Sequence, residues 1–383
     1  MRASVVLVLI ACANSPAAPQ RQAGSADSAA HVDPNVMQAP QLFAALCAHC
    51  HGAEAKGYRA DQAPSLVNPM FLESADDSYL RSSIERGRPG TSMAAYGKAL
   101  GGPLNPAAVD RLVSWLRSHG PAPRELPPVA TGSATRGNAL YVTHCLTCHG
   151  DRQRAGTYLM LTNARFLELA TDRFLQHAIR FGRPGTPMLP FQQKLTEQNV
   201  ADIVAYVRSF AQPVEIAPLP APSGKEPLFV NPNGTPPRFK VKDGRFVAAD
   251  DVKAALDAKR KMVIIDARPQ SEWMTTHIAG AVSIPHYQMD RLAEIPKDAW
   301  IVAYCACPHH LSGLVVDELQ KRGYPHAAVL DEGILEWQRR KYPTVTAPGA
   351  LPPPEPPVPQ ADKAELKKKP TGMNKPRGSR VEL

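Results

Sequence analysis

The 383-residue sequence has few aromatic residues and no long apolar run. Phe, Trp and Tyr make up 6% of the residues and are not interleaved with a basic stretch, so we expect no nucleic-acid partner. The formal net charge of +9 is dispersed among acidic residues, which is typical of a solvated surface. The first apolar run, residues 5–11, is too short to cross a bilayer as a helix.

The sequence also lacks the cysteines for a disulfide framework. Of its seven cysteines, four lie in two short motifs, one lies near the start, and two lie together near residue 305. Proline, by contrast, is abundant, with 39 residues gathered largely in a few stretches. We interpret residues 121–135 and 212–237 as linkers, and the Pro- and Lys-rich residues 347–383 as a disordered tail.

The first residues are typical of an export segment. Residues 1–11 carry Arg2 ahead of the apolar run, as in a short signal peptide. Leu-Ile-Ala-Cys at residues 9–12 resembles the lipobox of bacterial lipoproteins, which implies cleavage before Cys12 and lipidation of its thiol. The alternatives are an ordinary signal peptide with an incidental cysteine and a wrongly assigned start. Residues 12–36 would form a flexible tether.

Two copies of the spacing C-x-x-C-H carry the clearest chemistry. Two thiols on one helical turn can each form a thioether to a haem vinyl group, and the adjacent histidine can bind the iron. The cysteines are Cys47, Cys50, Cys145 and Cys148, and the histidines are His51 and His149. We therefore predict two covalently bound haem c groups. A zinc knuckle is disfavoured because neither copy has a second cysteine pair at suitable spacing.

Each copy is followed by a second shared string. Gly-Arg-Pro-Gly-Thr occurs at residues 87–91 and 182–186, and a methionine stands two residues after each threonine. We predict that these methionines, Met93 and Met188, are the sixth iron ligands. Two other methionines lack a repeated context and are weaker candidates: Met70 and Met160. Three histidines outside the motifs are expected at the surface: His31, His144 and His177.

An amphipathic helix follows each methionine. In the first copy Asn105 is a plausible N-cap, Pro106 suits the first helical position, and Gly120 suits the end. In the second copy Thr196 is the expected cap. Both helices carry an apolar stripe with the same helical spacing, formed by Val109, Leu112, Val113 and Leu116 and by Val200, Ile203, Val204 and Val207. The shared stripe indicates a duplicated unit.

The duplicated unit resembles class I cytochrome c. The resemblance covers residues 37–120 and 136–211, and residues 188–191 (Met-Leu-Pro-Phe) are close to the Met-Pro-x-Phe turn of that family. It implies a small all-α domain wrapped around a haem, with the methionine loop just before the last helix. Residues 93–96 (Met-Ala-Ala-Tyr) match the turn less well, so the assignment of Met93 depends on its place after the repeated string.

From residue 238 the hydrophobic pattern changes to short β-branched runs that alternate with helical patterns. The runs are residues 262–265, 300–304 and 327–330, and the helices are expected at 248–259 and 313–322. This alternation predicts an α/β domain with a mainly parallel sheet. We place the domain at residues 238–346.

This third domain resembles rhodanese. The matching residues are Asp266 to Trp273, His277 to Pro285, Tyr304-Cys305, Gly323-Tyr324 and Gly333 to Trp337. In that family a cysteine after the central strand accepts a sulfane sulfur as a persulfide, and backbone N–H groups of the following loop hold the anion. The resemblance implies that Cys305 is the nucleophile.

The loop at Cys305 departs from the family pattern. It is one residue longer, lacks the usual arginine, holds a second cysteine, Cys307, and contains Pro308, which removes one N–H group. His309 or His310 could supply a cation that lowers the pKa of an accessible thiol, and Cys307 could resolve a persulfide or an oxidised Cys305. The alternatives are a scaffold with inert thiols and, less favoured, a Cys/His metal site.

These patterns predict an exported, lipid-anchored dihaem cytochrome c on the periplasmic side of a bacterial membrane, fused to a rhodanese-like domain. It would pass single electrons between redox partner proteins. One alternative is a sulfurtransferase or thiol-oxidising enzyme that acts on a sulfur compound and delivers electrons to its own haems. The other is an electron carrier whose last domain serves only for docking.

Overall fold

The computed structural model describes residues 33–57, 63–213, 215–306 and 309–356. The described residues belong to one structural unit, Val32–Leu383. The predicted signal peptide, Cys12, His31, Cys307, nearly all of the tether and most of the tail lie outside the described residues.

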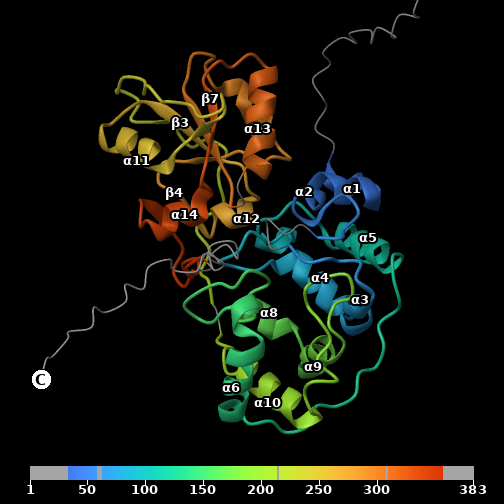
Figure 1. The fold of residues 1–383 in the computed structure, drawn as a ribbon. Helices are drawn as coiled ribbons and strands as arrows, with labels where there is room; N and C mark the ends of the chain where they lie inside the picture. Colours follow the sequence, from blue (N-terminus) through green and yellow to red (C-terminus); the bar gives the residue numbers. More distant parts are fainter. Residues whose placement is uncertain (1–32, 58–62, 214, 307–308, 357–383) are drawn as a thin grey trace, which may run out of the picture. The chain divides into compact units, whose positions relative to one another are not determined.

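Short helices build the first C-x-x-C-H unit (Figure 1). They are η1 (Pro34–Val36), α1 (Ala39–Leu46), α2 (Ala48–His51), α3 (Pro69–Ser74), α4 (Asp77–Arg86), η3 (Lys98–Leu100) and α5 (Pro106–Arg117). The cap predicted for α5 is confirmed, because the Asn105 side chain accepts a hydrogen bond from the Ala108 N–H. The predicted end at Gly120 is wrong: α5 stops at Arg117, and the Ser118 hydroxyl donates to the Trp115 carbonyl, 2.7 Å away.

The second unit repeats this plan. Its helices are α6 (Ala134–His144), α7 (Leu146–His149), α8 (Ala164–Leu169), α9 (Asp172–Phe181) and α10 (Glu197–Arg208). Thr196 caps α10 as predicted, and Asn199 completes a capping box. Both predicted apolar stripes are buried. Apolar residues of the two units form one continuous hydrophobic core.

The C-terminal domain begins with two short strands and continues with alternating helices and strands. Its elements are β1 (Phe229–Val230), β2 (Phe246–Val247), α11 (Ala249–Asp257), β3 (Met262–Asp266), α12 (Gln270–Trp273), β4 (Thr276–Ile278), β5 (Val282–Ser283), η4 (Asp290–Glu294), β6 (Ile301–Tyr304), α13 (His310–Lys321), β7 (Ala327–Leu330), α14 (Gly333–Arg339) and β8 (Thr344–Thr346). The three predicted strands are confirmed as β3, β6 and β7.

The main sheet has the order β1-β3-β6-β7-β2, with β5 also paired to β3. β1 is antiparallel to β3, and the other pairs of this sheet are parallel. β4 and β8 form a separate antiparallel pair. The mainly parallel sheet predicted from the sequence is therefore confirmed.

Helices cover both faces of the main sheet, which explains why its strands are continuous apolar runs. Side chains of β3 and β6 alternate between two hydrophobic clusters, one containing residues of α13 and the other residues of α11 and α14 (Figure 1). α13 begins at His310 rather than at the predicted Gly313, because His309 adopts a left-handed conformation, φ 76°, and turns the chain into the helix.

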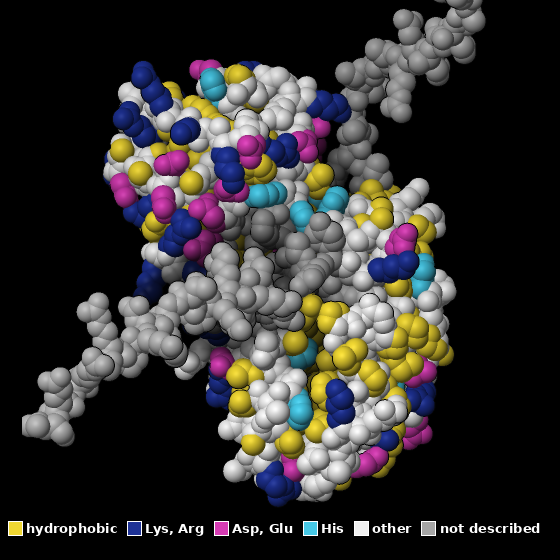
Figure 2. Space-filling model, in the orientation of Figure 1, with side chains coloured by type: hydrophobic (Ala, Val, Ile, Leu, Met, Phe, Trp, Pro, Cys, Tyr) yellow, Lys and Arg dark blue, Asp and Glu magenta, His cyan; other side chains and the backbone are white. Residues whose placement is uncertain are grey.

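The surface carries charges of both signs. On the face shown in Figure 2, dark blue and magenta side chains are intermixed over the region of α11 and α13, with no large area of one sign. Within the part of the chain that the structure describes, none of the helices combines the length and the apolar character needed to cross a bilayer.

Candidate functional site

Each C-x-x-C-H motif begins directly after one helix and forms a second, four-residue helix, α2 or α7. Cys47 follows α1, and the backbone N–H of His51 donates to the Cys47 carbonyl at 2.9 Å. In the second unit Cys145 follows α6, and the His149 N–H donates to its carbonyl, also at 2.9 Å. One helical turn thus brings two cysteines and a histidine of each motif together.

Both motif histidines are oriented by a backbone carbonyl. Nδ1 of His51 lies 3.1 Å from the Pro64 oxygen, and Nδ1 of His149 lies 2.7 Å from the Leu159 oxygen. Because a carbonyl can only accept, Nδ1 carries the proton, and Nε2 is left as the nitrogen that can bind a metal. Burial lowers the pKa of both rings, which favours the neutral form that a metal requires.

The four motif cysteines are free thiols. Burial of the sulfur raises the pKa of Cys47 and of Cys145 to about 12, so both thiols stay protonated at neutral pH. No disulfide joins either pair, and the thiols remain available for thioether bonds. Thiols, neutral imidazoles and an apolar surrounding together fit a covalently attached haem.

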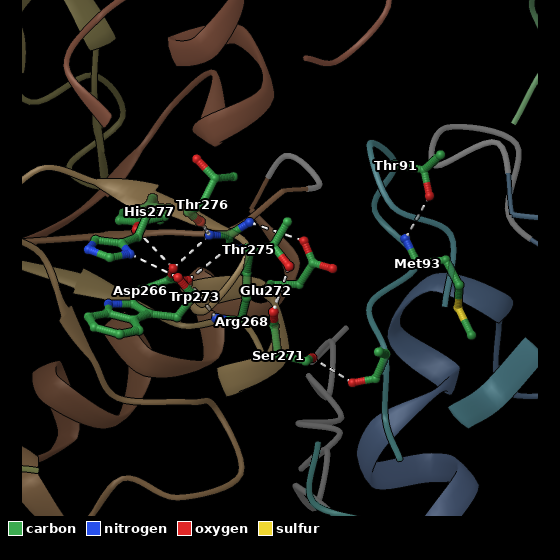
Figure 3. A network of polar contacts seen from close by, with 12 residues as sticks. Thr91, Met93, Asp266, Arg268, Ser271, Glu272, Trp273, Thr275, Thr276 and His277 are labelled. Carbon is green, nitrogen blue, oxygen red and sulfur yellow. Dashed lines mark hydrogen bonds and ion pairs between the residues drawn. The ribbon is translucent and has the colours of Figure 1, made fainter. Parts of the chain in front are cut away.

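The loop before each predicted methionine ligand is closed by backbone hydrogen bonds. The Arg88 N–H donates to the Met93 carbonyl at 2.7 Å, and the Thr91 hydroxyl donates to the Arg88 carbonyl. The Thr91 hydroxyl also accepts from the Met93 N–H (Figure 3). The second unit repeats all three bonds with Arg183, Thr186 and Met188. The shared string therefore encodes one loop shape that places a methionine at its end.

A glycine starts each of these loops because another residue would collide with the loop itself. Gly87 and Gly182 have φ values of 59° and 61°. A Cβ at Gly87 would lie 2.5 Å from the Ala94 carbonyl carbon, and one at Gly182 would strike the Met188 carbonyl oxygen. The positive φ and the close approach both require glycine.

In the C-terminal domain a buried polar network lies at the end of β3 (Figure 3). The Arg268 guanidinium donates to both carboxylate oxygens of Asp266, at 2.9 and 2.7 Å, and to the Thr276 carbonyl at 2.6 Å. The Tyr304 hydroxyl donates to the same aspartate at 2.9 Å. Asp266 and Arg268 are at most 2% exposed. The Tyr304–Asp266 bond joins the C-terminal ends of β3 and β6, directly before the residue that follows Tyr304.

That residue is Cys305, which lies immediately after β6. Its sulfur is 3.3 Å from the hydroxyl oxygen of Ser312, which lies in the first turn of α13. Cys305 is only 1% exposed, so its thiol is buried in the described structure, and its role as a nucleophile stays a prediction. Cys305 belongs to the hydrophobic cluster that also contains residues of α13. The sequence analysis assigned no role to Ser312. Its position seven residues after Cys305 was the only indication that it would lie near the sulfur.

The two loop histidines differ in position. His309 precedes α13, and its Nε2 donates to the carbonyl and to the carboxylate of Asp331, each at 2.9 Å. Its ring also packs on Phe246, with centroids 4.2 Å apart. The structure thus anchors His309 on the segment after β7. His310 is the first residue of α13.

Two further contacts were not expected from the sequence. His177 is 3% exposed, so its predicted surface position is wrong; it packs between the two C-x-x-C-H units, 3.4 Å from the Glu73 carboxylate. His144 is exposed as predicted.

The Ser271 hydroxyl of the C-terminal domain donates to the carbonyl of Ala95 at 2.6 Å, and Ala95 lies two residues after Met93 (Figure 3).

Comparison with known families agrees with this architecture. Residues 34–116 and 132–207 match the family described as "Cytochrome C oxidase, cbb3-type, subunit III", whose cytochrome c character implies haem c. Residues 248–340 match the "Rhodanese-like domain" family.

Individual relatives cover parts of the chain. The "Cbb3-type cytochrome c oxidase subunit CcoP" of Azospirillum sp. is 25% identical over 182 residues, which are 43% of this chain and 58% of the relative. The "Probable adenylyltransferase/sulfurtransferase MoeZ" of Mycobacterium tuberculosis is 31% identical over 103 residues, 26% of each chain. The chain thus spans less than two thirds of these curated relatives. A solved rhodanese-like domain from Anabaena sp. is 21% identical and covers 37% of this chain and 96% of its own, with a TM-score of 0.26.

Proposed function

We propose that this chain, which contains two cytochrome c domains and a C-terminal rhodanese-like domain, is an exported electron carrier with two haem c groups. The observation that carries the proposal is the repeated set of two free thiols, an oriented histidine and a closed methionine loop. Cys47 and Cys50 would hold one haem, and Cys145 and Cys148 the other. His51 with Met93, and His149 with Met188, would be the axial ligands.

The residues define what each domain contributes. A haem c with histidine and methionine ligands supplies single-electron transfer at a raised potential. The Nδ1 bonds to Pro64 and Leu159 hold each histidine ring in place, and the loop bonds hold each methionine. Two filled axial positions leave no site for a substrate, so the partners would be redox proteins. The relatives named as oxidase subunits support this choice of partner.

The proposed layout keeps the boundaries given by the sequence. Residues 37–120 and 136–211 would be the cytochrome c domains, and residues 238–346 the rhodanese-like domain. Lipidation of Cys12 would anchor the chain to a membrane on its periplasmic side, with residues 12–36 as the tether.

The first test counts the haems. The mass of the denatured protein should exceed the mass of the processed polypeptide by two haem groups, and the denatured band should stain for haem. Replacing Met188 with alanine should remove the methionine-to-iron charge-transfer band of the second haem and lower its potential. One haem, or haem that acid and organic solvent extract, would contradict the proposal; an unchanged spectrum in the variant would point to a different sixth ligand.

A second function is favoured by the position of Cys305 at the end of β6, beside Ser312 and the N-terminus of α13. In this alternative Cys305 carries sulfane sulfur, and Cys307, His309 or His310 assists. The Ser271–Ala95 hydrogen bond supports communication with the first cytochrome c domain, because Ala95 follows Met93 closely.

Cyanolysis with thiosulfate, recorded together with the haem spectrum, separates these functions. Sulfur transfer without haem reduction would indicate independent domains. Haem reduction on adding a sulfur donor would support an enzyme that passes electrons to its own haems. If neither signal is seen, the chain is an electron carrier whose rhodanese-like domain is used for docking.

A further inference from the structure

Two buried asparagines connect the cytochrome c domains in a reciprocal way. The Asn68 side-chain amide donates to the Pro184 carbonyl of the second domain at 2.8 Å. The Asn163 amide donates to the Pro89 carbonyl of the first domain at 2.9 Å. They are 5% and 8% exposed. Each therefore contributes a hydrogen bond that is shielded from water and crosses to the other domain.

The two asparagines occupy equivalent places. Asn68 is the N-cap of α3, where its oxygen accepts from the Met70 and Phe71 N–H groups. Asn163 is the N-cap of α8, and its oxygen accepts from the Phe166 N–H at 3.0 Å. The oxygen of each side-chain amide thus accepts hydrogen bonds within its own domain, whereas the nitrogen donates a hydrogen bond to the other domain.

Aromatic rings between the domains repeat the same symmetry. Tyr79 of α4 and Phe174 of α9 are stacked, with ring centroids 5.0 Å apart. Within each domain an equivalent pair meets edge-on, Phe71 with Tyr79 at 6.0 Å and Phe166 with Phe174 at 6.3 Å. Phe71 also meets Phe174 edge-on across the interface at 6.3 Å. In Figure 1 the helices concerned lie side by side, and α3 packs on α9 while α4 packs on α8. The interface has approximate twofold symmetry and a well-packed centre.

The loop arginines extend the same pattern. The Arg88 guanidinium lies 5.8 Å from the centroid of the Tyr79 ring, and the Arg183 guanidinium lies 5.4 Å from that of Phe174. Each arginine also begins the hydrogen-bonded loop that ends at the methionine of its own domain. Each methionine loop therefore contacts, through its arginine, one of the two rings that stack between the domains.

The carbonyls that accept the asparagine bonds belong to these same loops. Pro89 follows Arg88, and Pro184 follows Arg183, so each accepting oxygen lies inside a loop that closes on Met93 or Met188. A movement of the loop would break a buried hydrogen bond to the other domain, and losing such a bond is unfavourable.

We infer that Asn68 and Asn163 are reciprocal positioning residues, each of which holds the methionine loop of the opposite domain and so couples the two haem sites. This inference rests on the proposed function in assigning Met93 and Met188 as ligands. The crossed hydrogen bonds themselves do not depend on that assignment.

The test replaces each asparagine with aspartate. Asn68→Asp keeps the oxygen that caps α3 but loses the donor to Pro184. Amide hydrogen exchange in residues 183–188 should speed up by about fivefold, the loss expected for one hydrogen bond, while exchange in residues 88–93 stays unchanged. Asn163→Asp should give the opposite result. Asn105→Asp is the matched control, because Asn105 also caps a helix with its oxygen and is not bonded to either loop in the described structure.

Optical spectra give a second measurement. In a Met93→Ala background the remaining charge-transfer band belongs to the second haem, and Asn68→Asp should weaken it while Asn105→Asp does not. If a buried aspartate prevents folding, Asn68→Ser keeps a capping hydroxyl that is too short to reach Pro184. Unchanged exchange in both loops, or faster exchange only in the loop of the substituted domain, would overturn the inference. A wild-type protein without the band would contradict the ligand assignment alone, and the exchange data would still decide the crossed contacts.

Discussion

At the scale of single residues, Gly182 shows how strictly the methionine loop is built. Its φ is 61°, and a Cβ there would lie 2.6 Å from the Leu189 carbonyl carbon. Gly185 in the same loop has φ 79°, but a Cβ there would meet no atom within 4 Å. A substitution at Gly185 would therefore introduce backbone strain alone, whereas one at Gly182 would introduce both strain and a steric collision.

We predict that Gly182→Ala removes the charge-transfer band of the second haem, whereas Gly185→Ala keeps it. Alanine at Gly185 should cost only the strain of a positive φ, about 1–2 kcal/mol in the free energy of unfolding. Optical spectra and chemical unfolding of both variants provide the measurement. Equal losses of the band would show that strain alone disturbs the loop.

Some residue positions could be predicted from the sequence because repetition identified them. The cysteines, histidines and methionines of the two units recur in the same order, and their local turns have the same hydrogen bonds. The carbonyls that orient the histidines could not be predicted, because Pro64 and Leu159 lie in irregular segments. The burial of Cys305 depends on the packing of the whole domain and was missed for that reason.

At the scale of elements, Asp202 joins α10 to the start of α6. Its carboxylate accepts from the Arg136 guanidinium at 2.7 and 2.8 Å and from the Ser133 N–H at 2.7 Å. The hydrogen bonds from Arg136 are the main reason why the pKa of Asp202 falls to about 2. Because the pKa is below its value of about 3.9 in an unfolded chain, the ionised form stabilises the folded state.

We predict that this stabilisation is fully present above about pH 4 and disappears as the pH falls toward 2. Asp202→Asn should lower the free energy of unfolding by about 1.5–3 kcal/mol near pH 7, the range for hydrogen bonds to a charged group. The difference between variant and wild type should shrink between pH 4 and pH 2. Chemical unfolding followed by circular dichroism at a series of pH values measures it, and a constant difference would contradict the assignment.

The sequence predicted the helices and strands that carry a regular apolar pattern, but not how the two cytochrome c domains meet. Apolar stripes with helical spacing identified α5 and α10, and β-branched runs identified β3, β6 and β7. The interface depends instead on single aromatic residues on α3, α4 and α9 and on two N-cap asparagines. Such contacts have no periodicity, so a single sequence does not reveal them. The same reason explains the wrong surface prediction for His177.

At the scale of the whole molecule, the proposed lipidation of Cys12 would decide where the protein acts. We predict that the mature chain starts at Cys12 and carries the lipid there. Several acyl chains are needed for stable anchoring, since one chain binds a membrane only weakly. Cys12→Ser should therefore appear in the soluble fraction or remain uncleaved, as judged by membrane fractionation and N-terminal mass. Normal processing and membrane recovery of the variant would contradict the lipobox interpretation.

Electron flow between the domains would begin at Cys305. A thiolate and hydrosulfide that join as a persulfide release one proton and two electrons, and the two haems proposed for this chain would accept that number, one electron each. Attachment by a proline-rich linker keeps those acceptors at a high effective concentration. Cys305→Ser should then abolish haem reduction by sulfide while leaving reduction by ascorbate intact.

Ser312→Ala is the companion variant for this experiment, because it removes the hydroxyl 3.3 Å from the Cys305 sulfur but keeps the thiol. It should slow reduction by sulfide without abolishing it, since the nucleophile remains. Stopped-flow spectra of the three proteins with each donor give the rates. Equal rates with sulfide in wild type and Cys305→Ser would mean that sulfide reaches the haems directly, and the rhodanese-like domain would then have no part in the transfer.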